Sequence, residues 1–320
     1  MKSDQLSSSI VICTMSRPEE IQRCVASIAG QTLLPQQVVI VDAGDLGDVC
    51  NRLRDACESV GIEFIYCRDK PSTTRQRNLG AEYVTSDVIL FLDDDVELDS
   101  NYVEEIARQY QSDTEHRIGG ITGVLNPQPI AGHGIWRYFA ALFLLAETKS
   151  DVGTRLKRSN FPVHSTGLTQ NRTCQFMPST AVSYRTAVFN HHLFDVDLTG
   201  YVMAEDIDLS YRISRTHQLV MSPDAVYRHS KSSVARNSMR EQEKRRILFT
   251  QYFFCKNFGS SGINYLARYW ALLGMALRYL YFGIRHKDME KFLGFCDGIR
   301  SAGANGLLWQ RHFSPGPLDH

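Results

Sequence analysis

Three consecutive acids, Asp93, Asp94 and Asp95, end an apolar run in the segment FLDDDVEL. Adjacent carboxylates repel one another, and a bound divalent cation can offset that repulsion. Magnesium and manganese prefer such ligands, one or two carboxylates together with substrate phosphates. The other interpretation is a solvated loop before a helix whose N-terminus favours acids. The segment alone indicates either a cation and phosphate site or a helix-capping loop.

A second acidic group and a later histidine could complete such a site. Glu205, Asp206 and Asp208 lie in AEDIDLSYR, where the pattern predicts the start of a helix that runs to about Arg215. Acids at a helix start complement the macrodipole, and Asp208 suits that role. A carboxylate there could instead take a proton from a hydroxyl group. The imidazole of His229, expected in a loop after the strand-like piece QLVMSP, could bind Mn²⁺ beside a carboxylate.

The first hundred residues supply the elements that would position these groups. Apolar, β-branched runs alternate with amphipathic stretches, the pattern of βαβ units and a parallel sheet. The runs are IVICT, VVIVD, FIYC and VILFLD. Strands of this kind are covered on both faces, so we predict an α/β fold with an open, doubly wound, mostly parallel sheet and helices on both faces. Ligands bind outside the carboxyl ends of such strands, which directs attention to Thr14, Asp42 and Asp93.

Two later stretches are unusually apolar. Residues 136–146, WRYFAALFLLA, precede a basic stretch, and residues 263–284 predict a long helix. Arg268 and Arg278 interrupt the second stretch, so no run of about 18 uncharged apolar residues exists and a spanning helix is not expected. The polar residues of this helix fall within an arc of roughly 100°, which leaves a broad apolar face typical of a helix in a membrane interface. Packing on the rest of the chain, or across a dimer interface, is the open alternative.

Composition bounds the class of protein. The chain has 320 residues, of which 43% are hydrophobic and 22% charged, values of a soluble globular protein. The 35 basic residues balance the 35 acidic ones, so nothing indicates a nucleic-acid partner. The eight cysteines include no C-x-x-C pair and are interpreted as reduced thiols. The start, MKSDQLSSS, has no apolar signal region, so we expect a cytoplasmic protein.

Taken in order, these segments resemble family 2 of the nucleotide-sugar glycosyltransferases, inverting enzymes with the GT-A fold. The resemblance runs from about Ser9 to Arg246. It rests on IVICTMSRP, VDAGD, TTRQRNLGA, FLDDDVEL, AVSYRTAVF and GYVMAEDIDLSYR, and on the later His229. It implies a metal-dependent enzyme that moves one sugar from a nucleoside-diphosphate sugar to an acceptor hydroxyl and inverts the anomeric centre.

The resemblance also implies a role for each matching residue. Asp206 would be the catalytic base, and Glu205 would position the acceptor. Asp95 would be the direct ligand of Mn²⁺ or Mg²⁺, and His229 a second metal ligand or a diphosphate contact. The other matching residues would bind the nucleotide sugar: Thr14, Arg17, Asp42, Arg77, Asn78, Asp93 and Asp94.

Two segments depart from the family pattern. Ala43 stands where a second acid is common, and Asp45 where a small hydroxyl residue is usual. MPST, at residues 177–180, replaces a glycine-rich turn before AVSYR. Details of base recognition and of the sugar pocket therefore do not carry over.

The resemblance and the apolar stretches together indicate the partners. A UDP-sugar is the favoured donor, because in the family that this chain resembles the residue at the position of Asp42 commonly recognises uracil. The expected acceptor is a polyprenyl-diphosphate-linked glycan in surface polysaccharide assembly, used by a peripheral enzyme on the inner face of the cytoplasmic membrane. A homodimer would cover the same stretches. We expect residues 1–235 to form the catalytic domain and residues 236–320 a helical extension for the membrane interface or for dimerisation.

Two other classes of protein share part of this pattern. A sugar nucleotidyltransferase needs a glycine-rich loop with Lys or Arg after the first strand, which CTMSRPEEI lacks. A non-catalytic nucleotide-sugar-binding module would be expected to lose the base, Asp206, or the D-x-D motif that Asp93 and Asp95 would form, and both are present. Transfer catalysis is therefore the favoured prediction.

Overall fold

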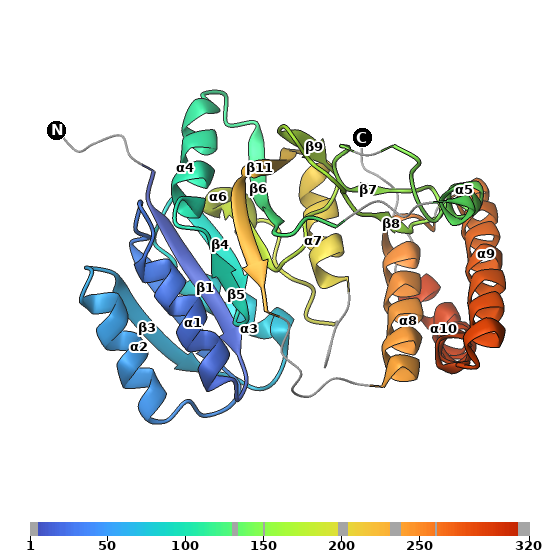
Figure 1. The fold of residues 1–320 in the computed structure, drawn as a ribbon, viewed down its shortest axis with the longest axis horizontal. Coiled ribbons are helices and arrows are strands. Elements are labelled where there is room, and N and C mark those ends of the chain that lie inside the picture. The colour runs from blue at the N-terminus through green and yellow to red at the C-terminus, as the bar shows by residue number, and fades with distance from the viewer. Residues whose placement is uncertain are drawn as a thin grey trace.

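A mixed β-sheet forms the centre of the molecule (Figure 1). The computed structural model describes residues 6–129, 134–149, 151–197, 204–230, 238–259 and 261–312, with side chains to residue 303. Within these ranges, nine strands form one sheet in the order β3-β2-β1-β4-β10-β6-β11-β5, and β9 pairs with β11. The strands are β1 (Ser8–Thr14), β2 (Gln37–Asp42), β3 (Glu63–Arg68), β4 (Val88–Asp93), β5 (Val96–Leu98), β6 (Ile118–Leu125), β9 (Arg172–Cys174), β10 (Ala181–Arg185) and β11 (Gln218–His229). A separate ladder joins β7 (Arg155–Leu156) to β8 (Pro162–Val163).

The four strands predicted from apolar runs are β1 to β4. They are parallel, as predicted, and lie in the order β3-β2-β1-β4. The rest of the sheet mixes directions, since β10 runs antiparallel between β4 and β6, while β6 and β11 are parallel. The short strands β5 and β9 run antiparallel beside β11. The predicted α/β fold class is confirmed, with antiparallel strands confined to the second half of the sheet.

One element differs from the prediction. His229 was expected in a loop, but it is the last residue of β11 and pairs with Val96 of β5. The predicted strand-like piece QLVMSP ends at Pro223, a residue type that usually interrupts a strand ladder. The structure accommodates Pro223 at an irregularity, where the register with β6 shifts between Met221 and Val226. The strand then continues and carries His229 to the acids that follow β4.

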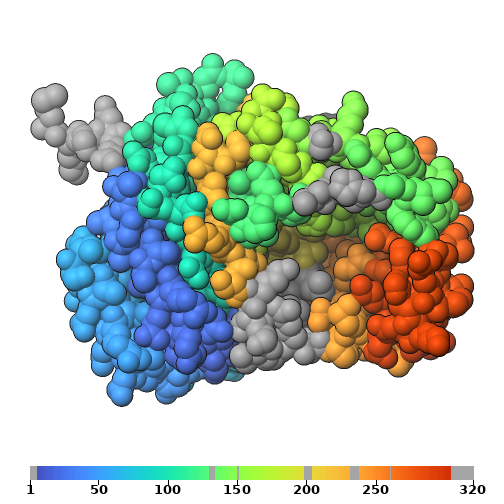
Figure 2. Space-filling model, in the orientation of Figure 1, coloured from blue at the N-terminus to red at the C-terminus, as the bar shows by residue number. Residues whose placement is uncertain are grey.

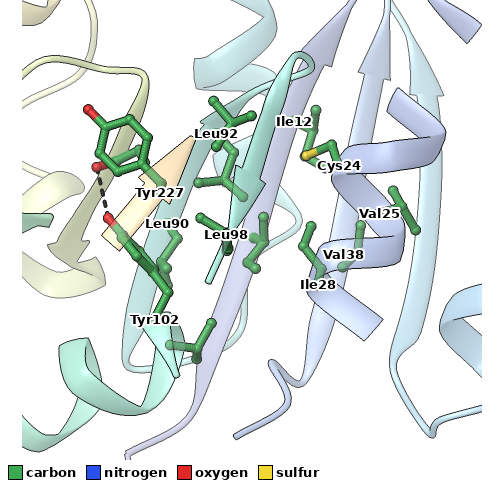
Figure 3. Close-up of a cluster of buried hydrophobic side chains, with 14 of the residues drawn as sticks. Ile12, Cys24, Val25, Ile28, Val38, Leu90, Leu92, Leu98, Tyr102 and Tyr227 are labelled. Atoms are coloured by element: carbon green, nitrogen blue, oxygen red, sulfur yellow. Dashed lines mark hydrogen bonds between the residues drawn. The ribbon is translucent and has the colours of Figure 1, made fainter. Parts of the chain in front are cut away.

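Helices cover both faces of the sheet, as predicted. Side chains alternate along each strand, so Ile10 and Ile12 of β1 pack in the cluster with α1, α2 and α4, whereas Val11 packs in the cluster with α3, α6 and α7. Figure 3 shows Ile12 and Val38 beneath α1. These helices are α1 (Pro18–Ala29), α2 (Asp48–Glu58), α3 (Thr73–Glu82), α4 (Tyr102–Ser112), α6 (Thr186–Phe189) and α7 (Glu205–Ser214).

A helical extension packs beside α7 at one end of the molecule (Figures 1 and 2). It consists of α8 (Met239–Asn257), α9 (Gly262–His286) and α10 (Glu290–His312). Phe176 and Ile207 pack with Phe253 of α8, which joins the extension to the α7 side of the sheet. In α10, Gly294 and Gly298 lie against the backbone of α8, close enough that a side chain at either position would clash. The predicted boundary between residues 235 and 236 lies outside the described residues.

The long predicted helix, α9, turns its small residues inward. Ala267, Ala271 and Gly274 are among its buried positions, and Gly274 lies against Phe143, which follows α5 (Ile135–Leu142). Arg268 is 1% exposed, donates to Thr250 Oγ1 at 3.1 Å, and burial lowers the pKa of its guanidinium to about 9. Leu272 and Met275 are buried as well, but most of the large apolar side chains of α9 are exposed. No helix in the described part of the chain is long and apolar enough to cross a bilayer.

Candidate active site

Two carboxylates and an imidazole converge where β4 and β11 end. The ligand atoms of Asp93, Asp95 and His229 lie within 4.8 Å of one another. His229 Nε2 lies 2.9 Å from Asp95 Oδ1, held there because the neighbouring Val96 pairs with His229 across the β5–β11 ladder. A mixed set of oxygen and nitrogen donors suits Mn²⁺. The predicted metal ligands Asp95 and His229 are therefore brought together, and Asp93 joins them.

Asp94 turns away from this group into the protein. It is 3% exposed and accepts hydrogen bonds from Thr14 Oγ1 at 2.7 Å and from Arg17 Nη1 at 2.9 Å. Burial raises the pKa of Asp94 to about 6, although Thr14 and Arg17 oppose that rise. Thr14, Arg17 and Asp94, three residues predicted to bind the nucleotide sugar, thus form one cluster. The acids on either side of Asp94 belong instead to the candidate metal site of Asp93, Asp95 and His229.

Asp42 ends β2 with both carboxylate oxygens occupied by the protein. It is fully buried, and accepts the backbone N–H of Gly44 at 2.7 Å and the hydroxyl of Tyr66 at 2.8 Å. Burial and the neighbouring Asp42 raise the pKa of Tyr66 to about 12. Sequence analysis missed this tyrosine, because FIYC fits a strand of the core and carries no separate signal.

Arg77 connects the candidate metal site, through Asp93, to Glu205 at the start of α7. Its side chain is 4% exposed and forms ion pairs of 3.0 Å with both Asp93 and Glu205. Gly80, one turn later in α3, permits this placement, since a Cβ there would lie 2.4 Å from Val11 Cγ1 of β1. Asn78 points elsewhere and exchanges hydrogen bonds with the backbone of Phe194. Sequence analysis assigned both residues to the nucleotide, and those roles stay predictions.

Asp206 sits at the first turn of α7, as predicted. Its carboxylate accepts the backbone N–H of Ser179 at 3.2 Å and that of Ile207 at 2.8 Å. Burial raises the pKa of Asp206 despite these two donors, and burial together with the charge of Asp206 raises the pKa of Glu205. A carboxylate whose pKa is raised binds a proton more readily, which suits a general base. The first residues of the GYVMAEDIDLSYR segment, 200–203, lie outside the described residues.

The MPST segment, which departs from the family pattern, is held against α7. Besides the contact of Ser179 with Asp206, the backbone N–H of Met177 donates to Ser210 Oγ at 3.0 Å. Sequence analysis missed Ser179, because a contact made through the main chain leaves no signature in residue type.

Asp208 has a different place from the one its sequence position indicated. It is 1% exposed and pairs with Lys256 of α8 and with Arg212, each at 3.0 Å. Complementing the helix dipole is thus only part of its role, since it also ties α7 to the helical extension.

Comparison with known proteins places this geometry in a family. The family model for "Glycosyl transferase family 2" matches residues 9–191. A glucosyl-dolichyl phosphate glucuronosyltransferase of Haloferax volcanii is 29% identical over 110 residues, 33% of this chain and 35% of that protein. The uncharacterized glycosyltransferase YwdF of Bacillus subtilis is 27% identical over 104 residues, 32% of this chain and 38% of that protein. The match thus spans little more than a third of these curated relatives.

Solved structures share the fold. The mannosyltransferase PcManGT of Pyrobaculum calidifontis, in complex with GDP-Man and Mn²⁺, has a TM-score of 0.59 at 13% identity, over 95% of this chain and 88% of that one. GalNAc-T7 with UDP, GalNAc and Mn²⁺ has a TM-score of 0.56 at 14% identity, over 89% of this chain and 59% of that one. These likenesses confirm the predicted GT-A type of architecture. With the family model matching more than half of its length, the chain belongs to glycosyl transferase family 2.

Proposed function

We propose that this chain is a metal-dependent inverting glycosyltransferase that moves one sugar from a nucleoside-diphosphate sugar to an acceptor hydroxyl. The observation that carries the proposal is the chain of ion pairs from Asp93 through Arg77 to Glu205. It links the candidate cation site to Glu205, the residue next to the candidate base Asp206 in the chain, and a single displacement requires both groups near one another. Residues 1–235 would form the catalytic domain and residues 236–320 the helical extension.

The residues of the chain divide the chemistry between them. Asp93, Asp95 and His229 would hold Mn²⁺ or Mg²⁺, which stabilises the charge of a departing diphosphate. Asp206 would accept the proton of the acceptor hydroxyl, and its raised pKa supports that assignment. Glu205, fixed by Arg77, would position the acceptor. A direct displacement at the anomeric carbon inverts configuration without a covalent enzyme intermediate.

The donor is tested by thermal stabilisation with UDP, GDP and dTDP, each with and without Mn²⁺. A ligand at 100 times its dissociation constant adds about 2.7 kcal/mol to stability. We expect a large shift with UDP that requires the metal. A shift with GDP alone would change the donor class, and no shift with any nucleotide would favour a non-catalytic binding module.

Two substitutions separate the base from the metal ligand. Asp206→Asn should abolish sugar transfer and leave metal-dependent UDP binding nearly unchanged, whereas Asp95→Asn should weaken that binding. Transfer is measured as release of UDP, and binding by titration calorimetry. Equal loss of UDP binding in both variants would contradict the assignment of the base.

The proposed acceptor is a polyprenyl-diphosphate-linked glycan, used at the inner face of the cytoplasmic membrane. An exposed apolar face on α5 and α9 supports it: Ile135, Tyr138, Leu142, Ile263, Leu266, Tyr269, Trp270, Leu273, Leu277, Leu280, Tyr281 and Ile284. The two helices are joined by Trp270, which stacks on Phe143 and donates to the carbonyl of Leu142. Basic residues with exposed side chains, Lys149, Arg155 and Arg158, follow α5 in the chain. Large exposed apolar patches mark interaction sites, and the nearby cations favour an anionic bilayer.

The membrane proposal is tested by co-sedimentation of the full-length protein with anionic phosphatidylglycerol vesicles and with neutral phosphatidylcholine vesicles. We expect binding to the anionic vesicles and its loss in Leu266→Glu, because Leu266 is 71% exposed on the face. Leu193→Glu is the control, since Leu193 is 52% exposed but lies outside the face. Failure of the protein to bind either vesicle, or a dimer in solution that Leu266→Glu dissociates, would overturn membrane docking.

A further inference from the structure

A cavity of about 320 Å³ lies between α7 and the helical extension. Two of its lining residues, Ala204 and Ile207, immediately flank the pair Glu205 and Asp206 in the chain. Met275, Arg278 and Tyr279 of α9 also line it. Its volume falls within the range of small-molecule sites. The cavity therefore lies between the first turn of α7, which carries the candidate base, and the helix that carries the exposed apolar face.

The lining combines an apolar wall with two cations. Leu145, Phe161 and Met275 supply apolar surface, and Arg246 and Arg278 supply guanidinium groups, while none of the described lining residues is an acid. Arg246 pairs with Glu243, at 3.1 Å from its Nε. Within the described part of the chain, Arg278 forms no ion pair or hydrogen bond. Arg278 is exposed to solvent, so its guanidinium is available to a ligand. Such a cation beside an apolar wall fits a ligand with an anionic head and a hydrocarbon chain.

We infer that this cavity binds the phosphorylated end of the lipid-linked acceptor. The phosphate oxygens would accept charge-assisted hydrogen bonds from Arg278 and Arg246, which suit phosphate because the guanidinium is planar and always charged. The first part of the lipid chain would lie along Phe161 and Met275. The inference rests on the proposed function, since it assigns a place to the acceptor beside Asp206.

Farnesyl diphosphate is the probe, titrated into the full-length protein in the presence of EDTA and followed by calorimetry. Inorganic diphosphate and farnesol are the comparison ligands, one without the chain and one without the charge. We expect farnesyl diphosphate to bind at least tenfold more tightly than either. Arg278→Gln should weaken its binding about tenfold, as expected for the loss of one charge-assisted contact of about 1.4 kcal/mol. Arg285→Gln is the matched control, two turns further along α9, exposed and outside the cavity lining.

Several results would overturn the inference. Equal affinity of Arg278→Gln and Arg285→Gln for farnesyl diphosphate would remove Arg278 from the site. If inorganic diphosphate bound as tightly as farnesyl diphosphate, the cavity would be a site for free phosphates. If farnesol bound as tightly as farnesyl diphosphate, the cavity would not recognise charge. In a separate titration without EDTA, displacement of the probe by UDP with Mn²⁺ would assign the binding to the donor site. The thermal stabilisation of the unmodified protein by UDP is measured separately. No stabilisation by UDP would count against the proposed function, whereas stabilisation by UDP without binding of farnesyl diphosphate would count only against this inference.

Discussion

Replacing Arg77 by methionine should strongly destabilise the fold, because it removes a cation shared by two acids. Methionine keeps most of the apolar length that packs beside Phe194, whose ring centroid lies 5.2 Å from the guanidinium carbon. The guanidinium is lost, and with it the charge and the hydrogen bonds to both acids. Glu205, whose side chain is 11% exposed, would keep no cation at 3.0 Å, and Asp93 would lose one as well.

The magnitude follows from burial. Two unit charges 4 Å apart attract by about 4 kcal/mol at an effective dielectric constant of 20. Water compensates Asp93 for part of this loss, since its side chain is 34% exposed, but reaches Glu205 much less. Breaking a buried pair by removing one partner typically costs about 3–5 kcal/mol, and we expect a loss in that range. A domain with a stability of about 5–15 kcal/mol would remain folded or nearly so.

The assay is urea unfolding at neutral pH with Arg75→Met as the control. Arg75 is on the same helix, has a side chain 55% exposed and pairs with Asp69 at 3.4 Å, so its replacement should change the unfolding free energy by less than about 1 kcal/mol. Adding Glu205→Gln to Arg77→Met should recover about 1–3 kcal/mol, because the two sites are coupled. A loss below about 1 kcal/mol for Arg77→Met, or no recovery in the double variant, would refute the bridging role of Arg77.

Three further predictions follow from single residues. The turnover number for sugar transfer should fall as the pH is lowered through the raised pKa of Asp206, because only the ionised base accepts a proton. A pH profile whose acid limb is centred at or below the ordinary aspartate pKa of about 3.9 would contradict this. Asp206→Asn should melt at a higher temperature than the unmodified protein at pH 7. A carboxyl whose pKa is raised in the folded state lowers stability as the pH rises from its unfolded-state pKa through its folded-state pKa. An unchanged or lower melting temperature in differential scanning calorimetry would argue against this. Gly80→Ala should lower the unfolding free energy by about 1–3 kcal/mol, because its Cβ would overlap Val11. Gly303→Ala in α10 meets open space and should raise the unfolding free energy by up to about 1 kcal/mol. Equal effects of the two variants in urea unfolding would show that α3 can move away from β1.

The first four strands could be predicted from sequence because each contains a continuous apolar run, which in β1, β2 and β4 is buried on both faces. The carboxyl ends of these three strands, at Thr14, Asp42 and Asp93, could be predicted because a polar residue ends each apolar run. Strand β11 was cut short at Pro223, because a local rule about proline cannot foresee a shift of register supported by neighbouring strands. Existence of a strand is a local property, whereas its length depends on its partners.

The orientation of side chains was beyond the sequence. Three adjacent acids give no sign that Asp94 turns to Thr14 and Arg17 while Asp93 and Asp95 turn to His229. The same holds for α9, whose polar arc was predicted without knowing that Arg268 would be buried and the apolar side exposed. Sequence patterns define which residues share a face, and only tertiary packing decides what that face contacts.

The helix α9 separates two demands that most helices place on the same residues. Its hold on the rest of the protein depends on its inward positions, which are the small residues Ala267, Ala271 and Gly274, the apolar Leu272 and Met275, and the buried Arg268. Its large outward residues, such as Leu266 and Ile284, contribute little to folding because they remain exposed. Natural selection can therefore adjust the outward residues to what they contact with little penalty in stability, while the inward positions stay constrained in size.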